Sequence, residues 1–261
     1  MISEGLRSGT QSVTRAINLL KMFSDTQPEW NLCDLARAAE LNKTTAYRLL
    51  TALERAGMLA RNGHTGAYRL GPETIALGGR ALRSNDLRSA GHAELEALAR
   101  IAGEAATLEV LTGDQVLIVE EVPASYLVAP WQSIGTRYPA HATSTGKLLL
   151  AFLPEAERRA ALQQPLRRLT DKTITDPDEM ERQSAAIRAQ GHAVAFEELE
   201  PDFVAVSAPV HNHDGQVVAA VSIGGPVTRL NAARLPEVIG MVTQAGRRIS
   251  ERLGFRDSSV T

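Results

Sequence analysis

Residues 141–152 read HATSTGKLLLAF, and the polar residues ahead of this apolar run permit three kinds of chemistry. The pattern Ser144-x-x-Lys147 is the nucleophile motif of one class of serine acyl-transfer enzymes. A Gly146-Lys147 pair in front of a helix is also the way in which a phosphate-binding loop ends. The third possibility is a plain anion pocket, because the first amides of a helix lack partners and carry partial positive charge.

The phosphate-loop interpretation fails at both ends of its motif. The consensus G-x-x-x-x-G-K-[ST] needs a glycine five residues before Gly146, where this chain has His141. It also needs Ser or Thr after the lysine, where this chain has Leu148. We therefore do not expect a nucleotide at this site.

The acyl-transfer interpretation lacks its partner motifs. Enzymes of that class also carry S-D-N and K-T-G elements. In this chain residues 172–174 read Lys-Thr-Ile and residues 84–86 read Ser-Asn-Asp. A serine acyl-transfer enzyme that uses Ser144 and Lys147 is kept as an alternative function, but no enzyme activity is expected.

The anion-pocket interpretation needs a helix that starts near Thr145. About four amides then lack partners, and the hydroxyls of Ser144 and Thr145 lie beside them, which favours a carboxylate. The competing interpretation is that Thr143 or Ser144 is simply the N-cap of the helix, with no ligand. The residues alone do not decide between these two.

The first seventy residues predict a compact helical unit. A helix over 13–23 has Ser12 as its N-cap, and its inner face comprises Val13, Ile17, Leu20 and Phe23. A second helix over 31–41 is followed by a tight turn, and a third runs from its cap Asn42 to Gly57. Two short helices across such a turn make a helix-turn-helix.

The outer face of the third helix carries the chemistry of a DNA reader. Ala46, Leu49, Leu50 and Leu53 cluster on its inner side, so Arg48 and Thr51 point outward. The segment 58–71 then alternates around Asn-Gly and Thr-Gly turns, which predicts a hairpin wing. The expected DNA contacts are Lys43, Thr44, Thr45, Tyr47, Arg48 and Arg55 on the helix, and Arg61, His64 and Arg69 on or beside the turn.

Charge and composition agree with two separate tasks. Residues 1–83 carry eleven Lys and Arg against seven Asp and Glu, whereas the rest carries seventeen against twenty-three. A basic N-terminal part favours a polyanion such as DNA as its partner.

The single cysteine, Cys33, excludes an internal disulfide and fits a reducing cytosol. The N-terminus lacks the apolar core of a signal peptide, and no apolar run approaches the ~18 residues of a membrane helix. A cytoplasmic protein without membrane contact or cofactor is therefore expected.

Several stretches together resemble the successive signatures of IclR-family transcriptional regulators. They include LCDLARAAELNKTTAYRLLTALERAGML, YRLG, HATSTGKLLLAF, VAVSAPV and AAVSIGGPVTRL, and they cover residues 11–254 in the family's order. The resemblance implies an α+β protein with an N-terminal winged helix-turn-helix, a linker helix and a C-terminal GAF-like mixed α/β effector domain. The implied boundaries are 11–72, 73–90 and 91–256. Implied partners are double-stranded DNA with an inverted-repeat operator, a small organic or aromatic acid, and a second copy, as a homodimer or homotetramer.

The same resemblance favours an effector at the helix start, so that Lys147 becomes structural, with its ammonium group facing solvent or an acidic neighbour. The expected effector contacts are Ser144, Thr145, Gly146, Ala195, Phe203, Ala205, Ser222 and Gly224, with Tyr126 and Trp131 either at the pocket mouth or at a dimer contact. Two positions depart from the family pattern. Tyr47 stands where the family often has His, and Phe203 follows Pro201-Asp202 where a Gly-hydrophobic pair is usual.

The second domain reads as a mixed α/β unit from its own residues. Asp176, Pro177 and Gly191 are the cap, first residue and stop of a helix, and residues 212–215 form a hairpin turn between two strands. Glu197 and Glu198 are not expected to form an acid–base pair, because adjacent strand residues point to opposite faces. A DNA-binding protein with a ligand-free dimerisation domain remains a further alternative.

Overall fold

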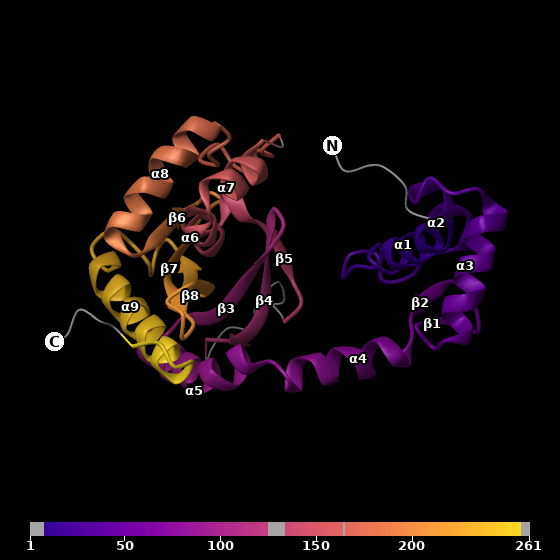
Figure 1. Cartoon of the computed structure of the whole chain (residues 1–261), viewed down its shortest axis with the longest axis horizontal. Coiled ribbons are helices and arrows are strands. Elements are labelled where there is room, and N and C mark those ends of the chain that lie inside the picture. Colours follow the sequence, from indigo (N-terminus) through magenta and orange to yellow (C-terminus); the bar gives the residue numbers. More distant parts are fainter. Residues whose placement is uncertain (1–7, 125–133, 164, 257–261) are drawn as a thin grey trace. The chain divides into compact units, whose positions relative to one another are not determined.

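The computed structural model describes residues 8–124, 134–163 and 165–256, and its contacts divide the chain into two units. The first unit is Met1–Ser84 and the second is Asn85–Thr261. Figure 1 shows helices around a small hairpin in the first unit, and helices on both faces of a larger sheet in the second. Within the described ranges, none of the helices combines the length and apolar character needed to cross a membrane.

The first unit is a winged helix-turn-helix. Its helices are α1 (Ser8–Leu20), α2 (Leu32–Ala38) and α3 (Lys43–Arg55), and strands β1 (Leu59–Arg61) and β2 (Tyr68–Leu70) pair antiparallel as the wing. The side chains of Asn31 and Asn42 cap α2 and α3 by accepting from the amides three residues on. The inner face of α3 is buried as expected, with Ala46 and Leu50 fully enclosed.

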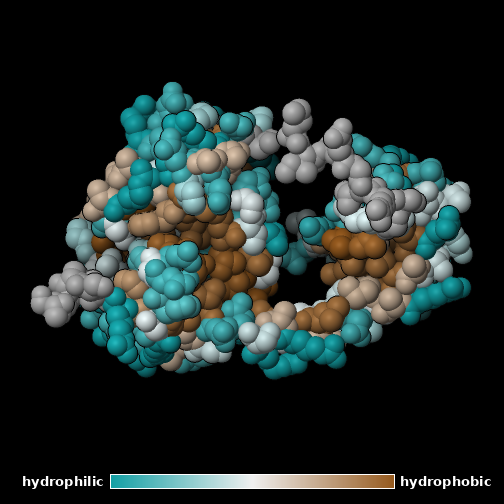
Figure 2. All heavy atoms as spheres, viewed as in Figure 1, coloured by the Kyte–Doolittle hydropathy of each residue, from teal (hydrophilic) through white to brown (hydrophobic). Residues whose placement is uncertain are grey.

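Helix α1 differs from its predicted form. It begins at Ser8, so Ser12 lies inside the helix and is not its N-cap. Leu19 and Phe23 enter the core, whereas Val13 is 59% exposed and Ile17 is 46% exposed. The physical reason is that only the C-terminal end of α1 reaches the core of the unit. Figure 2 shows brown apolar side chains gathered at the surface over α1 and along α4.

The expected linker helix is interrupted. Helix α4 (Pro72–Arg83) ends at Ser84, and α5 (Asp86–Ala102) starts afresh with the Asn85 side chain accepting from the Arg88 amide. Two apolar side chains of α4 are exposed, Ile75 at 77% and Leu77 at 45%. The break separates the two units along the chain.

The second unit is built on one six-stranded antiparallel sheet with the order β5-β4-β3-β8-β7-β6. Its strands are β3 (Ala105–Thr112), β4 (Gln115–Val122), β5 (Arg137–Pro139), β6 (Ala193–Phe196), β7 (Phe203–His211) and β8 (Val217–Pro226). The central pairs β3–β8 and β7–β8 set Thr107 opposite Ser222 and Ala205 opposite Gly224. Chain segments far apart in sequence therefore meet at the middle of the sheet.

Each face of the sheet has its own helical layer (Figure 1). Helices α5 and α9 (Leu235–Arg252) cover one face, over a core that includes Leu108, Val206 and Val221. The other face is covered by α6 (Ser144–Phe152), preceded by a short turn η1 (Ala140–Ala142), together with α7 (Glu155–Leu162) and α8 (Pro177–Gln190). As predicted, Asp176 caps α8, Gly191 ends it with a φ of 73°, and a turn at 212–215 joins β7 to β8.

Candidate effector pocket and DNA-binding surface

The N-terminus of α6 is capped by a side chain and keeps further donors without partners. Thr143 is the N-cap, and its Oγ1 accepts the Gly146 amide at 3.0 Å. The amides of Ser144 and Thr145 have no acceptor within the described residues, nor has the Ser144 hydroxyl a partner there. Thr143 is thus the cap, as one of the two interpretations expected, and unpaired donors remain on the next two residues.

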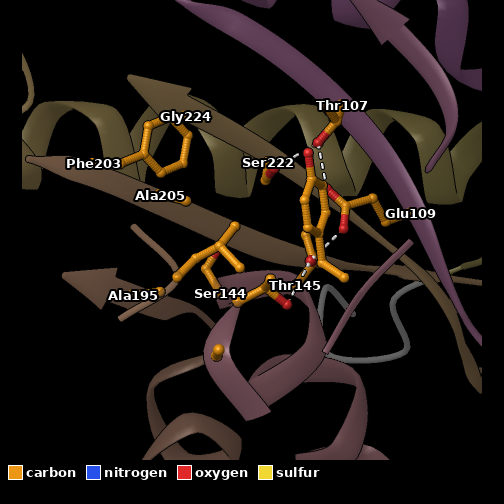
Figure 3. Close-up of a pocket in the computed structure, with 13 residues that line it drawn as sticks. Thr107, Glu109, Ser144, Thr145, Ala195, Phe203, Ala205, Ser222 and Gly224 are labelled. Carbon is orange, nitrogen blue, oxygen red and sulfur yellow. Dashed lines mark hydrogen bonds between the residues drawn. The ribbon is translucent and has the colours of Figure 1, made fainter. Parts of the chain in front are cut away.

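A buried cavity lies between this helix start and the sheet (Figure 3). Its volume is about 30 Å³ for the centres of water-sized molecules, which is room for one or two waters. The lining residues are Thr107, Glu109, Tyr138, Ala142, Thr143, Ser144, Thr145, Ala195, Leu199, Phe203, Ala205, Ser222 and Gly224. Seven of the ten effector contacts expected from the sequence are thereby brought together.

The other three fall elsewhere. Gly146 does not line the cavity, because its amide is bonded to Thr143 and its α-carbon packs on the preceding turn. A Cβ at this position would stand 2.2 Å from the Ala140 carbonyl oxygen, so the role of Gly146 is close packing. Tyr126 and Trp131 lie outside the described residues.

Glu109 on β3 is a lining residue that the sequence reasoning missed. It is 6% exposed, and its two carboxyl oxygens accept from Thr107 Oγ1 at 2.7 Å and Thr145 Oγ1 at 2.6 Å. Thr107 also shares a 2.7 Å hydrogen bond with Ser222. Burial raises the pKa of Glu109, and the two threonine hydrogen bonds oppose that rise. The alternation of side chains along a strand could have revealed Glu109, since Thr107 and Glu109 are two residues apart and point to the same face.

Acidic groups dominate the surroundings of the cavity. Burial, together with the charge of Glu109, raises the pKa of Glu121 to about 7. Burial, with the charges of Glu200, Glu109 and Glu121, raises the pKa of Tyr138 to about 12. The lining residues include no Lys, Arg or His among those described. The pocket therefore offers hydroxyl and amide donors rather than a cation.

The apolar end of the cavity is formed by Phe203, Ala205, Ala195 and Gly224 (Figure 3). The Phe203 ring lies against Gly224, where a Cβ would meet its Cζ at 2.6 Å. The ring can pack there because Gly224 has no side chain. In this position the Phe203 ring occupies part of the space at the apolar end of the cavity.

Lys147 turns away from the pocket. It is 2% exposed, and its Nζ donates to Glu198 Oε1 at 2.5 Å and to Gln183 Oε1 at 3.1 Å. Burial lowers the pKa of Lys147, which the nearby Glu198 opposes. The expected acidic neighbour is therefore Glu198, and Lys147 makes no hydrogen bond to Ser144 as a serine acyl-transfer enzyme would need. Glu197 instead pairs with Lys172, so the two adjacent glutamates act separately.

The outer face of α3 is open to solvent. Lys43, Thr44, Tyr47, Arg48 and Arg55 are exposed, and Thr45 is half-buried. Tyr47 is 50% exposed, at the helix end that enters a major groove in helix-turn-helix proteins. Thr51 departs from its predicted outward position, since its hydroxyl is buried without a partner in the described residues.

The residues expected to contact DNA from the wing differ in the contacts that they make within their own unit. Arg61 is exposed, and its guanidinium group pairs with Glu54 at 3.1 Å, donates to the Tyr68 hydroxyl at 2.5 Å and stacks on the Tyr68 ring. His64 and Arg69 are exposed. All three expected wing residues are therefore exposed, and Arg61 differs from the other two in also bonding residues of its own unit.

A winged helix-turn-helix joined to an α/β unit with an enclosed polar pocket defines a DNA-binding regulator with an effector-binding domain. The model of the IclR helix-turn-helix domain matches residues 12–63, and that of the bacterial transcriptional regulator IclR C-terminal matches residues 79–251. The chain belongs to the IclR family of transcriptional regulators, which are not enzymes.

Known relatives span nearly the whole chain. The HTH-type transcriptional regulator XynR of Escherichia coli is 32% identical over 94% of this chain and 98% of its own. An IclR transcriptional regulator from Alicyclobacillus acidocaldarius is 29% identical, with a TM-score of 0.82 over 94% of this chain and 99% of its own. An IclR homologue from Microbacterium hydrocarbonoxydans, solved with 4-hydroxybenzoate, is 28% identical, with a TM-score of 0.79 over 93% and 98%.

Proposed function

We propose that this regulator binds an inverted-repeat operator as a dimer or a pair of dimers, and that a small organic acid in the α6 pocket changes its affinity for DNA. The observation that carries the effector half is the Ser144 hydroxyl, which lines a buried cavity beside two unpaired helix amides. Such a helix start is a site for a carboxylate.

The operator half rests on α3 and on the family. Arg48, Tyr47 and Lys43 stand exposed on the outer face of the second helix of the helix-turn-helix. Arginine reads guanine or holds phosphate, and lysine holds phosphate. A single winged helix makes few phosphate contacts, so we propose that two copies bind two half-sites.

Self-association is supported by apolar side chains left in the open. Val13 and Ile17 on α1 and Ile75 and Leu77 on α4 are each more than 40% exposed. Exposed apolar side chains on a helix are found where it pairs with another chain. We propose a second copy as that partner, since dimers match inverted repeats by symmetry.

An aromatic acid needs more room than the cavity holds. Its volume admits one or two waters, and the Phe203 ring fills the space above Gly224. We propose that the half-buried Phe203 turns aside to admit the ligand and then packs on its apolar body. The homologue bound to 4-hydroxybenzoate supports an acid with an aromatic body as the first candidate to test.

The experiment is to titrate benzoate, 4-hydroxybenzoate and short aliphatic acids while following thermal unfolding and operator release. Ser144→Val should weaken any acid that binds about tenfold, because it leaves the carboxylate short of a donor. Ser89→Val, which removes an exposed hydroxyl of α5, is the matched control. Operator binding with no acid response would favour a ligand-free dimerisation domain, and cations or nucleotides as tight ligands would contradict the pocket assignment.

A further inference from the structure

Glu109 places a carboxyl group of the protein at the position proposed for the carboxylate of the ligand. Its Oε2 accepts from Thr145 Oγ1 at 2.6 Å, at the start of α6, beside the donors of Ser144. Figure 3 shows Glu109 on β3 and Thr145 on α6 joined by this hydrogen bond at the cavity wall. An acid ligand would therefore bring a second carboxylate to the same buried helix start.

The groups around Glu109 do not supply a counter-charge. On β4, Glu121 stands opposite Thr107, and on β5 the nearest titratable group is Tyr138. On α6, Lys147 is engaged by Glu198, and on η1, His141 bonds the Arg167 carbonyl oxygen through Nε2. Strands β6, β7 and β8 present Ala195, Phe203, Ala205, Ser222 and Gly224. Two like charges confined in such a site cannot both remain ionised, so one proton must be held.

A hydrogen-bonded chain links Glu109 to the cavity wall. Thr107 Oγ1 lies 2.7 Å from Glu109 Oε1 and 2.7 Å from Ser222 Oγ, and Ser222 lines the cavity. When Glu109 is ionised, Thr107 must donate to it, so Ser222 donates to Thr107 and presents a lone pair to the cavity. When a proton is on Oε1 of Glu109 the order reverses: Glu109 donates to Thr107, Thr107 donates to Ser222, and Ser222 has a free O–H.

We propose that Glu109, acting through Thr107 and Ser222, makes acceptance of an acid effector conditional on one proton. When Glu109 is protonated, Ser222 presents a donor to a ligand carboxylate. When Glu109 is ionised, the pocket presents an acceptor from Ser222 and the negative charge of Glu109. The ionised pocket therefore rejects acids and prefers a neutral ligand that donates, such as an alcohol. This inference rests on the proposed function, because it assumes that the effector binds in this cavity.

The regulatory consequence is a pH-dependent sensor. At a pH above the pKa of Glu109, binding of an ionised acid requires Glu109 to take up one proton from solution. Its Kd should therefore rise up to tenfold per pH unit above that point. Binding of a neutral alcohol should not weaken in the same range.

The first test measures binding of benzoate and of benzyl alcohol by calorimetry from about pH 6 to pH 9, a range in which benzoate stays ionised. The wild-type Kd for benzoate should rise with pH, and the Kd of Glu109→Gln, which is neutral at position 109 at every pH, should rise much less steeply, with Glu121 as the remaining neighbouring acid. Glu121→Gln is the matched control, since it removes the neighbouring acid and should keep the slope. Thr107→Val interrupts the hydrogen-bonded chain and should reduce the preference for benzoate over benzyl alcohol at low pH.

A second measurement needs no ligand. Burial raises the pKa of Glu109 in the folded chain above its unfolded value. Its protonated form then stabilises the fold below the unfolded pKa, and this contribution is lost as the pH rises through the folded pKa. The Tm of Glu109→Gln should therefore gain on that of the wild type as the pH rises, and a constant difference in Tm would overturn the inference.

The outcomes separate the two proposals. A wild-type Kd for benzoate that is flat with pH, together with weaker binding by Ser144→Val, would overturn the role of Glu109 and leave the acid effector standing. If Glu109→Gln binds benzoate at a pH where the wild type binds none, the result supports the proposed role of Glu109. Failure of wild type and Glu109→Gln alike to bind benzoate, 4-hydroxybenzoate or short acids would overturn the acid effector, and with it this inference.

Discussion

At the scale of single residues, buried carboxylates in the effector unit differ in what they face. Glu104 is 1% exposed and meets Arg229 at 2.5 Å, and Glu198 meets Lys147 at the same distance. Glu109 meets hydroxyl groups instead. A cation beside a carboxylate favours its ionised form, whereas burial among hydroxyl groups raises the pKa of Glu109. The placement of cations thus separates structural carboxylates from the one in the pocket.

Removing one partner of the buried Lys147–Glu198 pair should destabilise the fold strongly, because the other charge stays buried without it. Lys147→Met leaves Glu198 buried without its cation, and one of its oxygens already lacks a partner in the described residues. The free energy of unfolding should fall by about 3 to 5 kcal/mol in urea titrations. Lys172→Met breaks the pair with Glu197, in which the lysine is 53% exposed, and should cost less than about 1 kcal/mol. Equal losses in the two variants would contradict this account.

Arg48 is the residue on which the DNA-binding surface is most sharply tested. Its side chain is exposed on α3, so Arg48→Ala should leave the unfolding free energy nearly unchanged. Operator affinity should fall by about 1 to 3 kcal/mol, measured by fluorescence anisotropy at fixed salt. Arg100→Ala, at an exposed arginine of α5, is the control and should bind the operator as the wild type does. Unchanged affinity in a folded Arg48→Ala protein would refute the recognition-helix assignment.

At the scale of elements, the pocket depends on how closely α6 approaches the turn before it. Gly146 permits that approach, since a Cβ would stand 2.2 Å from the Ala140 carbonyl oxygen and 2.4 Å from its Cα. Gly146→Ala must push α6 away from η1, so the unfolding free energy should fall by about 1 to 3 kcal/mol or more. Gly78→Ala on α4 meets nothing within 4 Å and should instead stabilise slightly. Thermal unfolding of both variants decides, and a neutral Gly146→Ala would exclude the packing role.

Three helix ends were predicted correctly because their causes are local, whereas the predicted start of α1 at Ser12 was wrong. Asn42, Asp176 and Gly191 act within one turn of their own positions, so residue type and spacing were enough. The inner face of α1 was predicted wrongly, because periodicity finds an apolar stripe without showing what covers it. Val13 and Ile17 belong to that stripe and are exposed.

The candidate site was predictable only in part. The helix start and the strand residues of its apolar end carry family motifs, and period two placed Phe203 with Ala205 and Ser222 with Gly224. Glu109 was not found, since a glutamate within a strand is ordinarily assigned to solvent. Its burial depends on Ser222, which is 115 residues from Thr107, and on α6, and no local pattern reports such contacts.

At the scale of the whole molecule, the proposed assembly rests on the surface of α1. Ile17 is 46% exposed and Val13 is 59% exposed, although both are apolar. Ile17→Asp should leave the unit folded, because the side chain is outside the core. It should place a charge in the proposed contact between two copies, and so lower the fraction of dimer in light scattering at micromolar concentration. Operator affinity should fall in parallel, since the second half-site loses its tethered reader.

The matched control adds the same charge to the same helix away from the apolar stripe. Asn18→Asp is exposed next to Ile17 in sequence but points about 100° away around the helix. It should keep both the dimer and operator affinity, apart from a small loss from added negative charge near DNA. If Ile17→Asp remains a dimer with full operator affinity, then α1 is not the contact between copies. A wild-type protein that is monomeric and still binds an inverted repeat tightly would refute the dimer itself.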